Sequence, residues 1–246
     1  SVFVNNGTLQ LASTGGIQPT AGAGVSVLAS GTFDVTALSG GYVLPAGTGL
    51  AGAGNVLGNV TVASTSVVSP GSNLGTLTVS GNTTLSSGGN YNWQLYDAAG
   101  EAGSGWDLFS VGGVLDVAAT SGSPFKINLW SLSGTSPDVN GSALNFDATT
   151  SGTWRIATAS GGITNFDAGK FTINTSATNG TAGFANSLSG GTFSVAQSGN
   201  DLNLVFSGGS VGPTAIVIDV GSGTTQTQTQ AGYPSLSPSN ALSVTK

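Results

Sequence analysis

The sequence predicts an all-β protein, folded as a right-handed parallel β-solenoid. Strong helix formers are scarce, since the chain has no Met and only 4 Lys and Arg residues among 246. Thr, Val, Ser and Phe alternate along short stretches instead, with the period that is typical of strands. A short glycine-led unit also recurs at intervals close to one or two solenoid coils of about 20 to 30 residues.

The recurring unit reads Gly, any residue, a large apolar residue, any residue, and then Val, Leu or Ile. Its two apolar side chains would point to one face of a strand, while the residue between them faces water. We expect the glycine to supply a positive φ at the corner before each strand. The copies are Gly7–Leu11, Gly31–Val35, Gly58–Val62, Gly75–Val79, Gly113–Val117, Gly152–Ile156, Gly169–Ile173 and Gly191–Val195, with related strands at Phe125–Leu129 and Leu202–Phe206.

The central part of the chain leaves a second fold open. Residues 92–96 and 107–111 look like longer strands separated by a turn rich in Ala and Gly. Corner glycines and alternation also occur in antiparallel β-sandwiches. We therefore expect solenoid coils over residues 1–69, and either further coils or a wider sandwich-like region over 70–211. Residues 212–246 are expected to form an extended strand and a linker tail.

Composition excludes several classes of function. The chain has no His and no Cys, which removes Ser-His-Asp and Cys-His nucleophiles, thiolate and imidazole zinc sites, and disulfides. Four cationic side chains and a net charge of −6 are incompatible with binding nucleic acid. No apolar run is long enough to span a bilayer, so membrane insertion is not expected.

Three weak motifs could carry chemistry. Residues 47–52 match the glycine pattern of dinucleotide-binding loops, but no helix or βαβ unit surrounds them. Residues 138–141 resemble a fragment of a calcium loop that lacks the later acid. The acids Asp97, Glu101 and Asp107 lie near Trp93, Tyr96 and Trp106, as in a sugar site, but a solvated acidic turn beside core aromatics is the preferred explanation. We expect no catalytic residue, no cofactor and no metal.

Three stretches resemble a known family. Residues 4–12 read VNNGTLQLA, residues 69–79 read SPGSNLGTLTV, and the chain closes with LSVTK at 242–246. In composition and in the order of residues within the repeats, they are similar to the autotransporter-associated β-strand repeat proteins, which are large exported bacterial proteins. The resemblance implies one segment of a longer repetitive protein, or a subunit whose ends complement each other. The resemblance implies a role as an extracellular scaffold, fibre or adhesin. It supplies no catalytic motif.

The first functional hypothesis is a structural subunit of an extracellular or cell-surface fibre. The end coils of a solenoid expose unpaired strand edges that need caps or partners, and few charged gatekeepers protect them here. We expect association with other copies, or with adjacent segments of a longer chain. The residues expected to carry it are Val2, Val4, Ile216, Val217, Ile218, Val220, Tyr233, Leu242 and Val244.

The second hypothesis is a solenoid that binds or degrades surface polysaccharide. It would use stacked aromatic side chains and paired acids along the long flank of the coils. Scattered aromatics within strand motifs favour core packing instead, so the structural hypothesis is preferred. An adhesin overlaps with the first hypothesis and is not separable from it by sequence.

Overall fold

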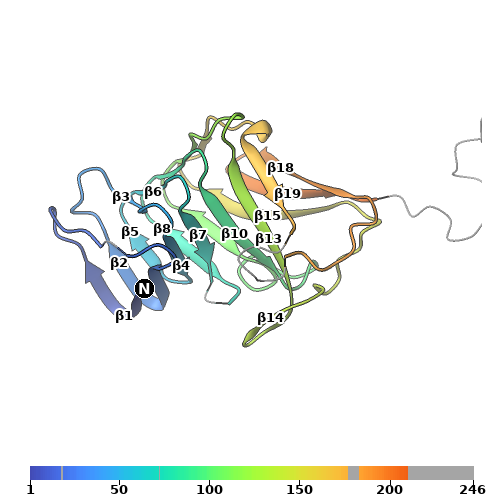
Figure 1. Ribbon diagram of the computed structural model, residues 1–246, viewed down its shortest axis with the longest axis horizontal. Helices are drawn as coiled ribbons and strands as arrows, with labels where there is room; N and C mark the ends of the chain where they lie inside the picture. Colours follow the sequence, from blue (N-terminus) through green and yellow to red (C-terminus); the bar gives the residue numbers. More distant parts are fainter. Residues whose placement is uncertain (18, 72, 177–182, 210–246) are drawn as a thin grey trace, which may run out of the picture. The chain divides into compact units, whose positions relative to one another are not determined.

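The computed structural model describes residues 1–17, 19–71, 73–176 and 183–209. Over these ranges the protein is all-β, as the sequence predicts, and its helical content is limited to the 3-10 turn η1 (Ala168–Lys170) (Figure 1). The described residues belong to one compact unit. In the described ranges, no helix has the length and apolar character needed to cross a membrane.

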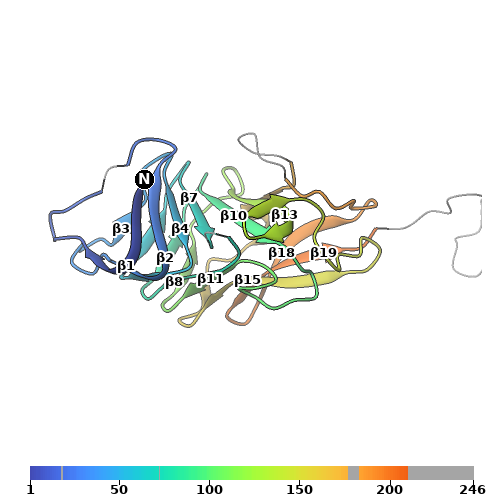
Figure 2. The same ribbon diagram turned by 90° about the horizontal axis from the view of Figure 1, so that it is seen from below.

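Successive strands enter three parallel ladders in turn, and Figure 2 shows the strands of the first ladder one after another. The first ladder contains the first half of β2 (Gly24–Asp34), then β4 (Gly49–Gly52), β7 (Val67–Pro70), β10 (Asn90–Leu95), β13 (Phe125–Thr135) and β17 (Phe171–Asn174). The second ladder contains the second half of β2, then β5 (Asn55–Leu57), β8 (Thr76–Val79), β11 (Leu108–Val111) and β15 (Gly152–Ala159).

The third ladder contains β3 (Tyr42–Val43), β6 (Val60–Val62), β9 (Thr83–Leu85), β12 (Leu115–Val117) and β16 (Ile163–Thr164). We call one passage of the chain through all three ladders a round, so that β7, β8 and β9 make one round. β1 (Val2–Gln10) pairs along both halves of β2 and adds one strand to the first and second ladders together. The expected division at residues 69 and 70 falls inside β7, which pairs with both β4 and β10.

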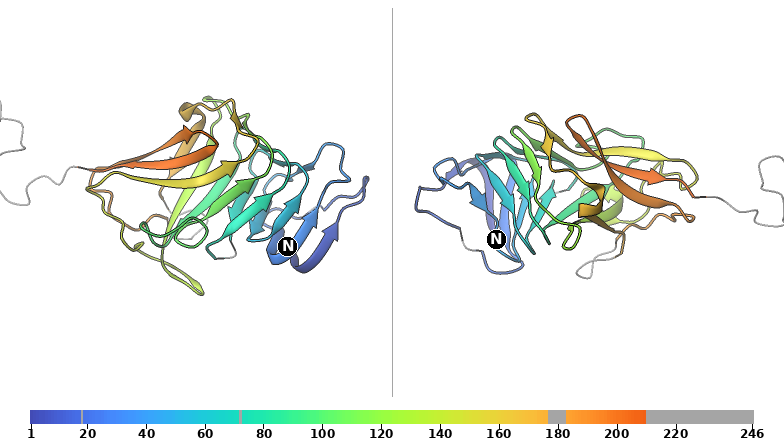
Figure 3. Two further views of the ribbon diagram at one scale, coloured as in Figure 1. Left: turned by 180° about the vertical axis from the view of Figure 1, so that it is seen from behind. Right: turned by 90° about the horizontal axis from the view of Figure 1, so that it is seen from above.

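Antiparallel pairing between strands begins late in the chain. β14 (Asp138–Asn140) folds back on the end of β13. β19 (Asp201–Ser207) then runs antiparallel to β15, and β18 (Thr192–Ser198) runs antiparallel to β19 (Figure 3). The stretches 92–96 and 107–111, which left a sandwich open, contribute instead to the parallel strands β10 and β11. The predicted tail at 212–246 lies outside the described residues.

The core is built from inward side chains that stack from round to round. Alternate residues are buried in strands such as β4, β6, β7, β8, β9 and β12, and the pairing register places buried residues beside buried residues of the neighbouring strands. In the first ladder one such row is Val25, Leu50, Val68, Tyr91 and Ile127. Each buried side chain of this size contributes about 1.5 to 3 kcal/mol relative to leaving it exposed.

The recurring glycines do not all serve the purpose that the sequence suggested. Gly7 and Gly58 have positive φ angles of 73° and 106°, as expected of a corner. Gly31 does not, and a Cβ atom at this position would collide with the carbonyl oxygen of Val4 on β1. At Gly31 the absent side chain therefore allows the close approach of two neighbouring strands.

Candidate functional site

The free side of β1 is the principal candidate site. β1 is hydrogen-bonded to β2 alone among the described strands, so its other side carries unpaired backbone groups (Figure 1). Leu11 donates its N–H to the carbonyl of Asp34, next to the end of β2. Because successive N–H groups of a strand point to opposite sides, those of Thr8 and Gln10 are directed away from β2.

The side chains of β1 leave this edge unprotected. None of them is charged, although charged residues are the common means of blocking strand edges. Phe3 is 66% exposed, the largest value among the large apolar residues of the described chain. The edge therefore combines free backbone groups with an exposed aromatic ring.

The predicted association residues have different surroundings. Val4 is 5% exposed and belongs to the core, and Val2 is half-buried against it. Their side chains hold β1 on the core, so a partner at this edge would meet the backbone of β1 and Phe3. Outside the described residues lie Ile216, Val217, Ile218, Val220, Tyr233, Leu242 and Val244.

The other end of the ladders is built differently. Antiparallel strands β19 and β18 follow β15, and aromatic rings gather beneath them. Phe146 lies 5.0 Å from both Phe184 and Phe206 by ring centroids, and Phe193 lies 4.8 Å from Phe206. These rings pack against the core in the manner of a cap.

The acidic cluster of the sequence does not form a sugar site. Asp107 is fully buried, and its two carboxyl oxygens accept the backbone N–H groups of Gly75 and Gln94, each at 3.0 Å. Burial raises the pKa of the Asp107 carboxyl well above its ordinary value. Trp93 is likewise fully buried, and its indole N–H donates to the carbonyl of Asp107. The solvated turn expected there is wrong for Asp107, because this side chain joins Gly75, the residue before β8, to β10 inside the core.

Of the other residues in this cluster, Asp97 and Trp106 have structural partners, and Glu101 is exposed, as expected of a solvated turn. Asp97 accepts hydrogen bonds from Asn145 and from the backbone of Ala99, and these bonds lower the pKa of its carboxyl. The indole N–H of Trp106 donates to the carbonyl of Arg155 at 3.0 Å. Asp97 and Asp107 therefore do not act as a pair of acids facing one cleft.

The calcium-like fragment forms part of β14. Asp138 accepts a hydrogen bond from the side chain of Gln94 at 2.9 Å, and burial raises the pKa of its carboxyl. Across the described residues, no three acidic side chains come close enough together to hold a metal ion.

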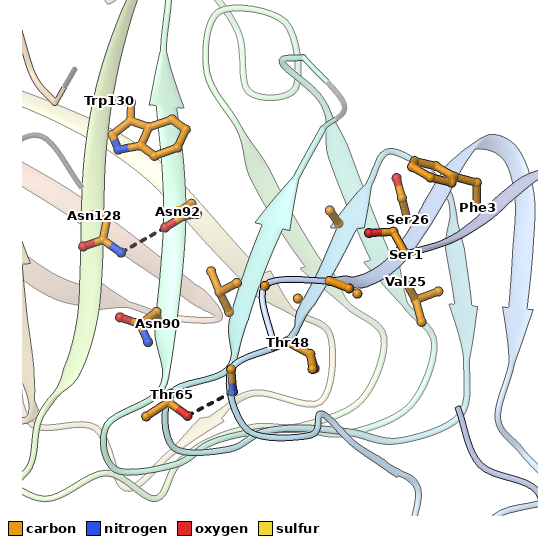
Figure 4. A pocket seen from close by; sticks show the side chains of 17 residues that line it. Ser1, Phe3, Val25, Ser26, Thr48, Thr65, Asn90, Asn92, Asn128 and Trp130 are labelled. Atoms are coloured by element: carbon orange, nitrogen blue, oxygen red, sulfur yellow. Dashed lines mark hydrogen bonds between the residues drawn. The ribbon is translucent and has the colours of Figure 1, made fainter. Parts of the chain in front are cut away.

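A surface groove was not predicted from the sequence. It has a volume of about 510 Å³ and lies on the outer face of the first ladder (Figure 4). Small residues of β2 and β4 line it, together with Phe3 at one side and Asn92, Asn128 and Trp130 at the other. The sequence shows that Asn90 and Asn92 occupy alternate positions of one stretch, and would therefore share a face of a strand. It does not show that Asn128 lies beside them.

Comparison with known proteins adds no relative. No protein-family model matches the chain, and no curated protein matches it significantly.

Proposed function

We propose that this chain is a structural segment of an extracellular bacterial fibre or surface scaffold, and that it self-associates through β1. The observation that carries the proposal is the free side of β1, which ends two parallel ladders at once. A charged fraction of 6% for the whole chain leaves little electrostatic repulsion between copies. No catalytic role is part of this proposal.

The fold underlying the proposal is a right-handed parallel β-solenoid, in which each round is one coil. Parallel pairing between strands of successive rounds supports it. Parallel crossover connections are right-handed in about 98% of cases, which supports the handedness. The likeness to autotransporter-associated repeat proteins agrees with a long, repetitive surface protein.

The partner strand that we propose for β1 is the segment Ile216–Val220 of another copy. Four of its five residues are the β-branched residues Ile and Val, which favour a strand. Pairing with β1 would satisfy the outward N–H groups of Thr8 and Gln10, while Tyr233, Leu242 and Val244 would extend the contact. In a longer chain, the adjacent segment would occupy the same edge.

The test is a proline in β1. In Thr8→Pro the outward N–H is removed, whereas the bonds to β2 are retained, because proline is tolerated on edge strands with this orientation. We expect the wild-type chain to sediment as concentration-dependent oligomers or filaments, and Thr8→Pro to sediment as a monomer. Thr8→Val keeps the N–H and should associate like the wild type.

A second variant identifies the partner strand. The double change Ile216→Lys and Ile218→Lys should also give monomers if residues 216–220 pair with β1. Association that survives this change but not Thr8→Pro would mean that two β1 edges pair directly. A wild-type chain that stays monodisperse and monomeric at high concentration would refute the proposal.

A further inference from the structure

The groove on the first ladder has the chemistry of a binding site for an uncharged ligand. None of the residues that line its 510 Å³ carries a formal side-chain charge. Its floor consists of small residues of β2 and β4, among them Gly24, Ser26, Gly49 and Ala51. A hollow in the outer face of a sheet follows directly from such residues, because their neighbours on both sides are larger.

Strand register places polar and aromatic side chains in one row across the groove. Phe3 pairs with Ser26, and Ala51 follows in the next strand of the ladder. Further along, Asn92 pairs with Asn128, and Asn128 pairs with Asn174. Trp130 lies two residues beyond Asn128 on β13, so an aromatic ring stands at each side of the small-residue floor (Figure 4).

The asparagines form a directed chain of hydrogen bonds. The Nδ2 group of Asn174 donates to Oδ1 of Asn128 at 3.1 Å, and Nδ2 of Asn128 donates to Oδ1 of Asn92 at 2.9 Å. Asn128 is only 3% exposed, so this chain is a fixed part of the sheet. Such chains polarise their members, which strengthens the final donor.

The last donor in this chain is presented to the groove. Within the described structure, Nδ2 of Asn92 makes no hydrogen bond, although its Oδ1 is occupied. The neighbouring Asn90 shows the opposite pattern, since its Nδ2 donates to the carbonyls of Ser66 and Gly88 and its Oδ1 remains available. One donor and one acceptor therefore lie on adjacent outward positions of β10.

We propose that this groove binds a neutral polysaccharide. Hydroxyl groups can pair with both the Asn92 donor and the Asn90 acceptor, and sugar rings can stack on Phe3 and Trp130. A net charge of −6 disfavours an anionic polymer. The strands repeat at about 4.8 Å, a spacing similar to the length of one sugar unit in an extended chain. Phe3 is shared with the β1 edge, whereas Asn90, Asn92 and Trp130 belong to the groove and not to that edge.

The test is affinity electrophoresis of the full chain in native gels that contain a soluble polysaccharide. We expect retardation by neutral β-glucan or glucomannan and none by polygalacturonate. In Ala51→Arg the groove floor is filled by a long charged side chain, so retardation should be lost. Asn92→Ala should weaken binding by roughly three- to tenfold, the effect of one hydrogen bond.

Two further variants separate binding from folding. Thr84→Arg places the same side chain outward on β9 in the third ladder, away from the groove, and should bind like the wild type. Trp130→Phe keeps an aromatic face and should retain binding, whereas Trp130→Ala should lose it. No retardation by any neutral polymer, equal retardation by polygalacturonate, or unchanged binding in Ala51→Arg would overturn the proposal.

Discussion

At the scale of single residues, one buried hydroxyl has no partner. Thr83 on β9 is fully buried, and its Oγ1 makes no hydrogen bond. Its neighbours in the third ladder, Val60 and Leu115, are buried and apolar. A polar group that is buried without a partner costs about 1 to 3 kcal/mol of stability.

Thr83→Val is therefore expected to stabilise the protein by about 1 kcal/mol, because it removes the hydroxyl and keeps the branched shape. Urea unfolding would measure the gain as a higher midpoint with an unchanged slope. The matched change Thr84→Val, on the outward face of the same strand, should alter the midpoint much less. A lower midpoint for Thr83→Val would show that the hydroxyl is satisfied in solution.

Two buried acids should make stability depend on pH. Burial raises the pKa of the Asp107 and Asp138 carboxyls above the ordinary value of 3.8, and the negative charge of Asp138 raises the pKa of Asp107 further. Between the unfolded and folded pKa values the folded chain holds more protons than the unfolded chain. The free energy of unfolding therefore falls as pH rises through this window.

Asp138→Asn tests this dependence. Asparagine keeps an oxygen acceptor for the Gln94 side chain but carries no charge. We expect the variant to exceed the wild type in unfolding free energy by less than about 1 kcal/mol at about pH 8, because the site is partly exposed. The difference should vanish as the pH falls below the ordinary value of 3.8, where the carboxyl is protonated in both the folded and the unfolded chain. A variant less stable at both pH values would contradict the sign.

At the scale of elements, asparagines link successive rounds at the start of the third ladder. Asn82 donates its backbone N–H to Oδ1 of Asn59 at 2.8 Å. Its own Oδ1 accepts the backbone N–H of Val114 at 2.9 Å, in the next round. Each side chain thus replaces a backbone acceptor where the chain turns a corner.

Asn82→Ala should lower the free energy of unfolding by about 1 kcal/mol, because the N–H of Val114 loses its acceptor. Asn82→Asp retains a side-chain oxygen and should remain close to the wild type. Unfolding in urea distinguishes the two variants. Equal losses in both would mean that the effect comes from the turn itself and not from the bond to Val114.

The same elements show what the sequence could predict. Alternation within each glycine-led unit correctly placed inward residues such as Val60 and Val62, because burial follows a period of two along a strand. Which strands pair with each other could be predicted less well, because the pairing depends on the lengths of the connections between rounds. Asn92 and Asn128 are 36 residues apart, and only the register of β10 and β13 brings their side chains together.

Asp107 shows a different limit of sequence reasoning. In the sequence it follows a turn with other acids, which suggests solvent exposure. In the fold its carboxyl accepts two backbone N–H groups, one of them from Gly75 in the preceding round. Hydrogen bonds from distant backbone groups leave no pattern in the sequence, so neither its burial nor its raised pKa could be predicted.

At the scale of the whole compact unit, the two ends of the ladders are unequal. Near β19, antiparallel strands and the rings of Phe146, Phe193 and Phe206 pack against the core. At β1 the parallel pairing stops without such a cover among the described residues. A backbone edge that is open to water gains hydrogen bonds by accepting another strand, whereas the aromatic end gains little.

This inequality predicts a local change in hydrogen exchange on association. In dilute monomer, the amides of Thr8 and Gln10 should exchange rapidly, because they point away from β2, while those of Val68 and Tyr91 in the middle of the first ladder should be protected. Raising the concentration should protect Thr8 and Gln10 selectively. If both amides are already protected in dilute monomer, β1 is covered within a single chain and cannot be the edge that recruits a partner.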